Sequence, residues 1–114
     1  MQRLFVATAF SVALAVPAMA CEAPDHASVD IPSGASASEA QIRAAQQTVA
    51  SMVQELEAYT ACIDAEIDSN RMPAAQRRIA MRDHDDAIDT AQRLATRMNR
   101  EIRNYNRAAQ LASQ

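Results

Sequence analysis

The chain has 114 residues, with one glycine, four prolines, 4% aromatic residues and a formal net charge of -3. A chain of this length has room for one small domain. It contains no glycine-rich phosphate loop, no Cys-x-x-Cys pair and no nucleophile elbow, so we expect a protein that is not an enzyme and carries no cofactor.

Residues 1–20 have the pattern of a secretory signal. Arg3 gives a basic start, residues 4–16 carry no charge, and the small residues Ala18 and Ala20 precede a predicted cleavage site. The apolar run is too short to span a bilayer comfortably. We therefore expect a mature chain of 94 residues in the periplasm or outside the cell, where 10 arginines oppose 14 acidic residues.

Cys21 and Cys62 both remain after cleavage. In an oxidising compartment an even pair of cysteines predicts one disulfide. Residues 21–38 can stretch to roughly 55 Å, more than the roughly 36 Å of helix between Ser38 and Cys62. In a competing interpretation, Cys21 is the lipidated first residue of a lipoprotein, which would bring the chain to a membrane. Ala18 stands where such a site usually has Leu, which favours the disulfide.

Residues 21–37 predict an extended arm rich in serine and turn-forming residues. Val29 and Ile31 are its apolar anchors, and we expect them to lie on the helices that follow. A turn is predicted over residues 31–34, where Pro32 presets one backbone dihedral and Gly34 frees another.

A first helix is predicted over residues 38–69. Its apolar side chains recur at three- and four-residue steps, at Ile42, Ala45, Val49, Met52, Leu56, Tyr59, Ile63 and Ile67. Ser36 with Glu39 predicts a capping box at its start, and Ser38 with Gln41 is the alternative. Pro73 disfavours helical geometry in the preceding residue, so the helix should end before it.

A second helix is predicted over residues 73–110. Its stripe is Met81, His84, Ile88, Ala91, Ala95, Met98, Ile102, Tyr105 and Ala109. A short connection between two long helices predicts an all-α fold, a long antiparallel hairpin over residues 38–114. A turn near Met72 sets Tyr59 against His84 and Leu56 against Ile88. A two-helix hairpin buries little surface, so dimerisation into a four-helix bundle is a further expectation.

The acidic cluster around residues 83–89 is the candidate metal site. Carboxylates and an imidazole are ligands that divalent cations take, which singles out His84, Asp85 and Asp89. The alternative is a solvated acidic face that pairs with arginines at four-residue spacing. His84 is also predicted to form a polar pair with Tyr59 in the core.

The end of the second helix is basic. Five arginines form a candidate contact surface for anionic lipid, polysaccharide or acidic proteins: Arg93, Arg97, Arg100, Arg103 and Arg107. The alternative is a solvated face that favours the helix dipole near a C-terminus. Export and the scarcity of aromatic residues disfavour a nucleic-acid partner.

A resemblance to a group of known proteins depends on residues spread over most of the mature chain: Cys21, Ile31-Pro32-x-Gly34-Ala35, Glu39, Ala45-Gln46, Val49, Tyr59, Cys62, His84, Asp89 and Asn99. The pattern resembles a group of small, uncharacterised exported proteins of proteobacteria that have a signal peptide, a proline-containing arm and a helical hairpin. The resemblance implies a location in the envelope and pairing of Cys21 with Cys62. It implies no activity.

These observations predict a non-enzymatic exported protein that acts through protein–protein contacts in the cell envelope. Its partner would be a second copy of the chain or another envelope protein. The alternatives are a periplasmic carrier that binds a metal or small ligand, and an envelope chaperone or stress protein.

Overall fold

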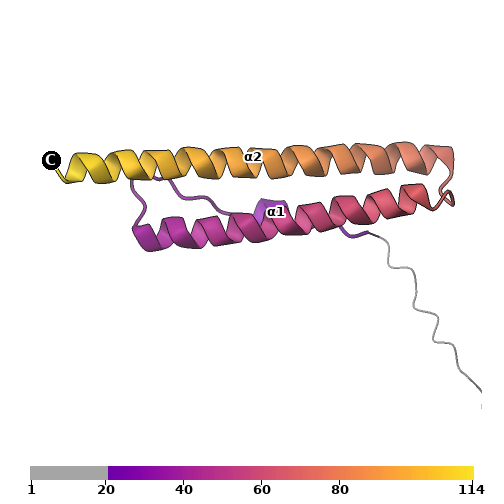
Figure 1. Ribbon diagram of the computed structural model, residues 1–114, viewed down its shortest axis with the longest axis horizontal. Coiled ribbons are helices and arrows are strands. Elements are labelled where there is room, and N and C mark those ends of the chain that lie inside the picture. Colours follow the sequence, from indigo (N-terminus) through magenta and orange to yellow (C-terminus); the bar gives the residue numbers. More distant parts are fainter. Residues whose placement is uncertain (1–20) are drawn as a thin grey trace, which may run out of the picture.

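The computed structural model describes residues 21–114, so the predicted signal segment lies outside the described residues. Two long helices, α1 (Glu39–Asp68) and α2 (Ala74–Ala112), follow a short 3₁₀ helix, η1 (His26–Ser28). The long helices run antiparallel and pack along their length, and the last turns of α2 extend past the start of α1 (Figure 1). The predicted all-α hairpin is confirmed.

The first turn of α1 is fixed by the second of the two predicted capping boxes. The Gln41 N–H donates to Ser38 Oγ at 3.2 Å, and the Ser38 N–H donates to Gln41 Oε1 at 2.8 Å. The box built on Ser36 is wrong, because that residue belongs to the preceding turn. Its N–H donates to the Ser33 carbonyl at 3.2 Å.

The chain reverses direction just after α1. Asn70 has a φ of 57°, in the left-handed region that often ends a helix and that Asn tolerates better than most residues. Pro73 then adopts a φ of -58° directly before α2, where its missing N–H leaves no donor unpaired. The predicted end of the first helix and the predicted turn are both confirmed.

The stripe predicted for α1 forms most of the buried core. Its buried members are Ile42, Ala45, Val49, Met52, Leu56 and Ile63. On α2 the prediction is partly wrong, because only Ala87 and Met98 are buried, while Met81 is 53% exposed and Ile88 is 41% exposed. Ala87 lies where Ile88 was expected, against Leu56 and Met52.

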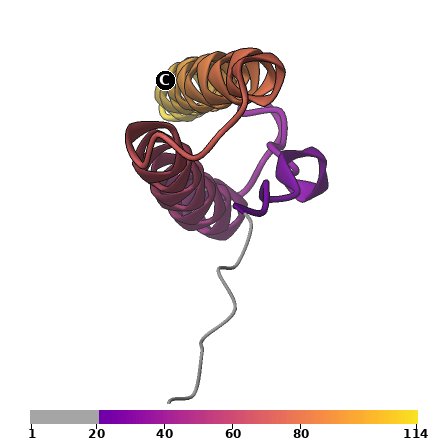
Figure 2. The same ribbon diagram turned by 90° about the vertical axis from the view of Figure 1, so that its right-hand side faces the viewer.

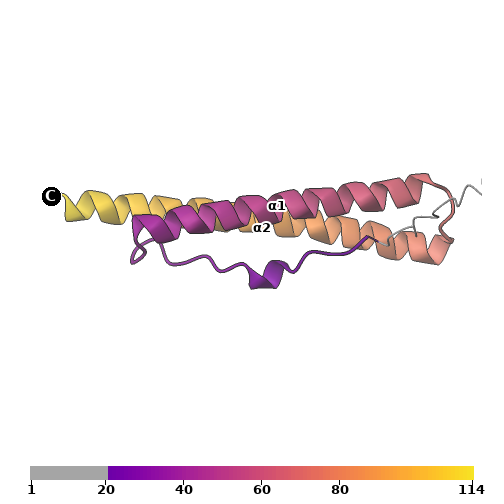
Figure 3. The same ribbon diagram turned by 90° about the horizontal axis from the view of Figure 1, so that it is seen from below.

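The arm accounts for this rotation of α2. It runs back along the hairpin as a third element beside both helices (Figures 2 and 3). Ile31 is 4% exposed and packs with Ile42, Val49 and Met98, and Val29 packs against the same cluster. Part of α2's inward surface therefore faces the arm rather than α1. The predicted docking of both arm residues is confirmed.

Candidate functional site

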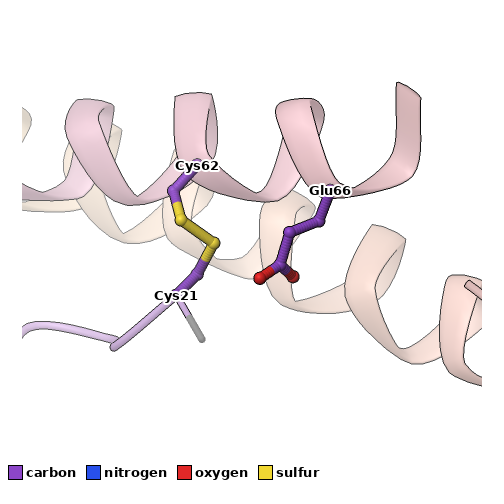
Figure 4. A group of neighbouring side chains, drawn as sticks. All are labelled: Cys21, Cys62 and Glu66. Carbon is purple, nitrogen blue, oxygen red and sulfur yellow. A yellow bond between two sulfur atoms is a disulfide. The ribbon is translucent and has the colours of Figure 1, made fainter. Parts of the chain in front are cut away.

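A disulfide fixes the first end of the arm. Cys21 is bonded to Cys62 on α1, with the two Cα atoms 5.8 Å apart, so the predicted pairing is confirmed. The Glu66 carboxylate lies beside the two sulfur atoms (Figure 4), within 4.8 Å. The three side chains resemble a metal-ligand set, but each sulfur is bonded to the other and offers no thiolate.

Gly34 fixes the other end of the arm on α2. Its N–H donates to Glu101 Oε2 at 2.7 Å. A Cβ on this residue would lie 1.9 Å from the Glu101 carbonyl oxygen and 2.8 Å from the Tyr105 nitrogen. Gly34 does not have a positive φ. The turn prediction was therefore wrong in two respects: the turn lies at residues 34–36, and glycine is needed for close approach rather than for an unusual dihedral.

Glu101 is held in its ionised form at this contact. The pKa of its carboxyl is lowered, first by the hydrogen bond from the Gly34 N–H, and further by Asn104 and Arg100; partial burial opposes these effects. Its side chain is 13% exposed. Sequence reasoning missed this contact, although two signals were present. Gly34 is the only glycine, and Glu101 is the only acidic residue after Asp89.

The predicted basic surface is partly engaged within the molecule. Arg93 pairs with Asp89 at 2.9 Å, and Arg100 approaches Glu101 at 3.5 Å. Arg97 donates to the Ile31 carbonyl at 3.5 Å, which adds a long hydrogen bond to the arm. Arg93 and Arg100 nevertheless remain 71% and 61% exposed. A role for these arginines in binding a partner stays a prediction.

His84 lies against acidic side chains rather than against Tyr59. Its Nε2 is 3.1 Å from Asp64 Oδ1 on α1, and its Nδ1 is 3.4 Å from Asp85 Oδ1. Within residues 21–114 the predicted hydrogen bond to Tyr59 is not formed. The reason is geometric, because Tyr59 lies on the side covered by the arm, next to Ala23 and Pro24.

Tyr59 borders a shallow cavity of about 250 Å³ between the arm and the helices. Its pKa is raised, chiefly because burial disfavours the phenolate, and further by the negative charges of Asp83 and Glu66. The hydroxyl is therefore neutral at physiological pH. The cavity lining includes the buried side chains of Leu56 and Ala87, together with Asp83 and Asp86.

The structure does not bring the three predicted metal ligands together. Asp89 pairs with Arg93, and the Asp85 side chain is 83% exposed. Asp85 contacts His84 at 3.4 Å, but Asp89 lies five positions along the helix, where its side chain points in a different direction from that of His84. In the described part of the chain, the one group of three potential ligands is the disulfide with Glu66.

Among residues 21–114 no element covers the side of the hairpin away from the arm, and we call it the open side. A groove there is lined by residues of both helices: Leu56, Glu57, Thr60, Ala87, Ile88, Ala91 and Gln92. Ile88 and Met81 lie seven residues apart on α2, two turns along one face. Both are large apolar side chains that remain about half exposed. Across residues 21–114, neither long helix has an apolar stretch that could cross a bilayer.

Comparisons with protein-family models, with curated proteins and with solved structures found no match. A fold of this kind hosts many unrelated roles, so the hairpin alone does not define a function. A function has to be inferred from the surfaces of the hairpin instead.

Proposed function

We propose that the protein is an exported, non-enzymatic helical hairpin that acts through protein–protein contacts in the cell envelope. The observation that carries this proposal is the open side, where Met81 is 53% exposed and Ile88 is 41% exposed. Ile79 and Leu111 are also exposed, but on other faces of α2. Ile88 on the open side lines a groove between the two helices, and an apolar surface of this kind marks a contact site. The arm stiffens the opposite side, since it is tied to α1 by the disulfide and to α2 by Gly34.

The disulfide supports the proposed location. Disulfides persist in oxidising compartments and are rare in the cytosol. The pairing also supports an unlipidated mature protein, because a Cys21 sulfur bonded to Cys62 cannot carry a thioether-linked lipid. Both inferences agree with the signal predicted over residues 1–20.

The partners of the reactive side chains support a non-enzymatic role. Both cysteines are consumed by their mutual bond, so neither offers a thiolate nucleophile. The carrier alternative loses support because His84, Asp85 and Asp89 are not gathered into one site. Calorimetric titration with Ca²⁺, Zn²⁺ and Cu²⁺ distinguishes a contact protein from a metal carrier, since heat of binding from any of these ions would favour a carrier.

Photocrosslinking in the cell envelope tests the proposal. A photoreactive phenylalanine analogue replaces Ile88 on the open side, and Gln47, on the side with the arm, is replaced as the control. We expect a protein adduct of defined mass from position 88 and none from position 47. Absence of any adduct at position 88 and at position 81 would overturn the proposal.

The mass of the mature chain is measured on the same material. We expect a chain that begins at Cys21 and is lighter than the reduced form by two hydrogen atoms. A mass increase equal to an acyl anchor would contradict the proposed unlipidated state.

A further inference from the structure

We propose that the Cys21–Cys62 disulfide is a redox switch that controls the first part of the arm. Its reduction releases residues 21–28 from the helices, while the hairpin and the rest of the arm keep their contacts. This inference goes beyond the proposed function, since it concerns the side with the arm and needs no partner on the open side.

Residues 21–28 have few attachments to the helices apart from the disulfide. Six of these eight residues are exposed, and the other two, Cys21 and Pro24, are half-buried. Across residues 21–114, no hydrogen bond or ion pair joins this segment to α1 or α2. Its hydrogen bonds are local, as from the Ser28 N–H to the Asp25 carbonyl at 3.3 Å. Once the covalent bond is broken, conformational entropy favours release of a terminal segment with so few contacts.

The charges around this segment do not replace the disulfide as an attachment. Glu22 and Asp25 line the same cavity as Glu55, so three negative charges lie near one another there. His26 lines the neighbouring cavity with two aspartates of α2 and forms no ion pair among the described residues. Cleavage at the predicted site would add one positive α-amino group, which the two carboxylates of the segment outweigh. The charges therefore favour release.

The rest of the arm has attachments of its own. Ile31 is buried in the core, and Val29 packs against the buried residues of both helices. Gly34 donates to Glu101, and Arg97 donates to the Ile31 carbonyl. Neither cysteine belongs to the buried core. Reduction therefore removes the attachment at one end of the arm without opening the core.

The first part of the arm covers an apolar part of the hairpin. Ala23 and Pro24 border two neighbouring cavities together with Tyr59, and Leu56 and Ala87 line one of the two. Removal of the segment opens both cavities and exposes more of the Tyr59 ring. The oxidised and reduced chains therefore present different surfaces on this side.

A dithiol reductant operates the switch by thiol–disulfide exchange. Its thiolate attacks one of the two sulfur atoms, the S–S bond breaks, and the other cysteine leaves as a thiolate that takes up a proton. The second thiol of the reductant then attacks the mixed disulfide, which frees the remaining cysteine as a thiol and forms the reductant's own disulfide. In total two electrons and two protons pass from the dithiol to the chain. Both cysteines are half-buried rather than enclosed, so a thiol can reach them.

Glu66 controls how readily this exchange occurs. Its carboxylate lies within 4.8 Å of both sulfur atoms (Figure 4). Negative charge at this position repels an incoming thiolate and disfavours the thiolate that leaves. Glutathione should therefore reduce the Glu66→Gln variant about threefold faster than the wild type. Glu57→Gln, on the open side, is the control and should react at the wild-type rate. Equal rates for the two variants would overturn the role assigned to Glu66.

Backbone ¹⁵N relaxation of the mature chain measures the release. We expect residues 22–28 to behave as part of the folded arm in the oxidised chain. After reduction with dithiothreitol, their heteronuclear NOE should fall to the values of an unfolded chain, whereas residues 29–37 and both helices keep folded values. Reoxidation should restore the first state. The variant Cys21→Ser with Cys62→Ser should show the released state with and without dithiothreitol.

Fluorescence of Tyr59 measures the uncovering of the surface. Tyr105→Phe leaves Tyr59 as the single tyrosine, and the chain has no tryptophan. Acrylamide should quench this tyrosine about twofold more efficiently after reduction, because more of its ring is exposed. Unchanged quenching would show that the segment does not cover Tyr59.

Thioredoxin, as a protein dithiol, tests whether the switch operates in the folded chain. We expect alkylation and mass measurement to show full reduction without denaturant. Reduction that occurs only after urea has unfolded the chain would make the disulfide a structural crosslink and overturn the proposal. Folded NOE values for residues 22–28 after reduction would also overturn it, and so would loss of folded values throughout the hairpin. None of these results concerns the open side, so the proposed function is tested separately by photocrosslinking.

Discussion

Gly34 and Glu101 show how two single residues hold the arm on α2. The N–H to carboxylate distance is 2.7 Å, a charge-assisted hydrogen bond that is stronger than a neutral one. The position of a Cβ, 1.9 Å from the Glu101 carbonyl oxygen, leaves no room for any other residue at 34. The arm and α2 therefore touch backbone to backbone.

Replacing this glycine should loosen the arm. Gly34→Ala forces the arm away from α2 and should cost about 1–3 kcal/mol of stability, the usual range for overpacking. Urea unfolding followed by circular dichroism measures the cost. Ala35→Ser changes the exposed neighbour and should alter stability by less than about 0.5 kcal/mol. Equal stability of Gly34→Ala and wild type would show that the close approach is not needed.

The lowered pKa of Glu101 makes the same contact sensitive to acid. Because its folded pKa lies below the ordinary value of 4.5, ionised Glu101 stabilises the fold above that value. This contribution is lost as the pH falls through the lower, folded pKa. Glu101→Gln should therefore be less stable than wild type at neutral pH.

The difference in free energy of unfolding between Glu101→Gln and wild type should shrink as the solution is acidified. Urea unfolding at about pH 7 and about pH 3 measures it at both limits. Glu57→Gln, on the exposed surface of α1, serves as the control and should show a much smaller difference. A difference for Glu101→Gln that grows towards low pH would contradict the sign of the shift.

The two long helices show how far sequence reasoning reaches at the scale of an element. The three- and four-residue spacing of apolar side chains predicted both helices, and Pro73 predicted the connection. Both signals depend on residues that are close together in the sequence. In α2 the stripe was predicted one residue off at one point, with Ile88 in place of Ala87, whereas Met98 is buried and Ala91, Ile102 and Tyr105 pack against the core as predicted. Local pattern could not reveal this, since the rotation of α2 depends on the arm, a neighbour distant in sequence.

The same limit applies to the candidate site. The disulfide could be predicted because the chain has two cysteines and the predicted export would place them in an oxidising compartment. The His84 contact could not, because a small rotation of α2 decides whether the imidazole lies near Tyr59 or near Asp64. The Glu101 contact depends on where the arm crosses α2, which no periodicity encodes.

Two variants test which serine caps the start of α1, and each variant serves as the control for the other. Ser38→Ala removes the acceptor of the Gln41 N–H and should cost about 0.5–2 kcal/mol. Ser36→Ala should change stability little, because the Ser36 side chain makes no hydrogen bond within the described part of the chain. Urea unfolding of both variants measures the loss of free energy of unfolding. A larger loss for Ser36→Ala than for Ser38→Ala would contradict the observed cap.

At the scale of the whole molecule, the disulfide joins two residues 41 positions apart and closes the arm onto the hairpin. Closing a loop of this length removes entropy from the unfolded chain worth on the order of 4 kcal/mol in the chain-entropy model. The variant that replaces Cys21 and Cys62 by Ala should lose stability of that size. Its denaturation midpoint, compared with that of the oxidised wild type, measures the loss. A loss below about 1 kcal/mol would show that the disulfide constrains the chain little.

Loss of the disulfide should also change the stability that the Gly34 contact contributes. The arm is then held by its apolar contacts, the Gly34 hydrogen bond and the long hydrogen bond from Arg97. If the arm detaches as one unit, Gly34→Ala can cost no more than the remaining free energy of docking. A double-mutant cycle should therefore give a smaller cost for Gly34→Ala in the cysteine-free chain than in the oxidised chain. Ser38→Ala, which acts within α1, should cost the same in both. Equal costs for Gly34→Ala in both chains would mean that the two ends of the arm bind independently.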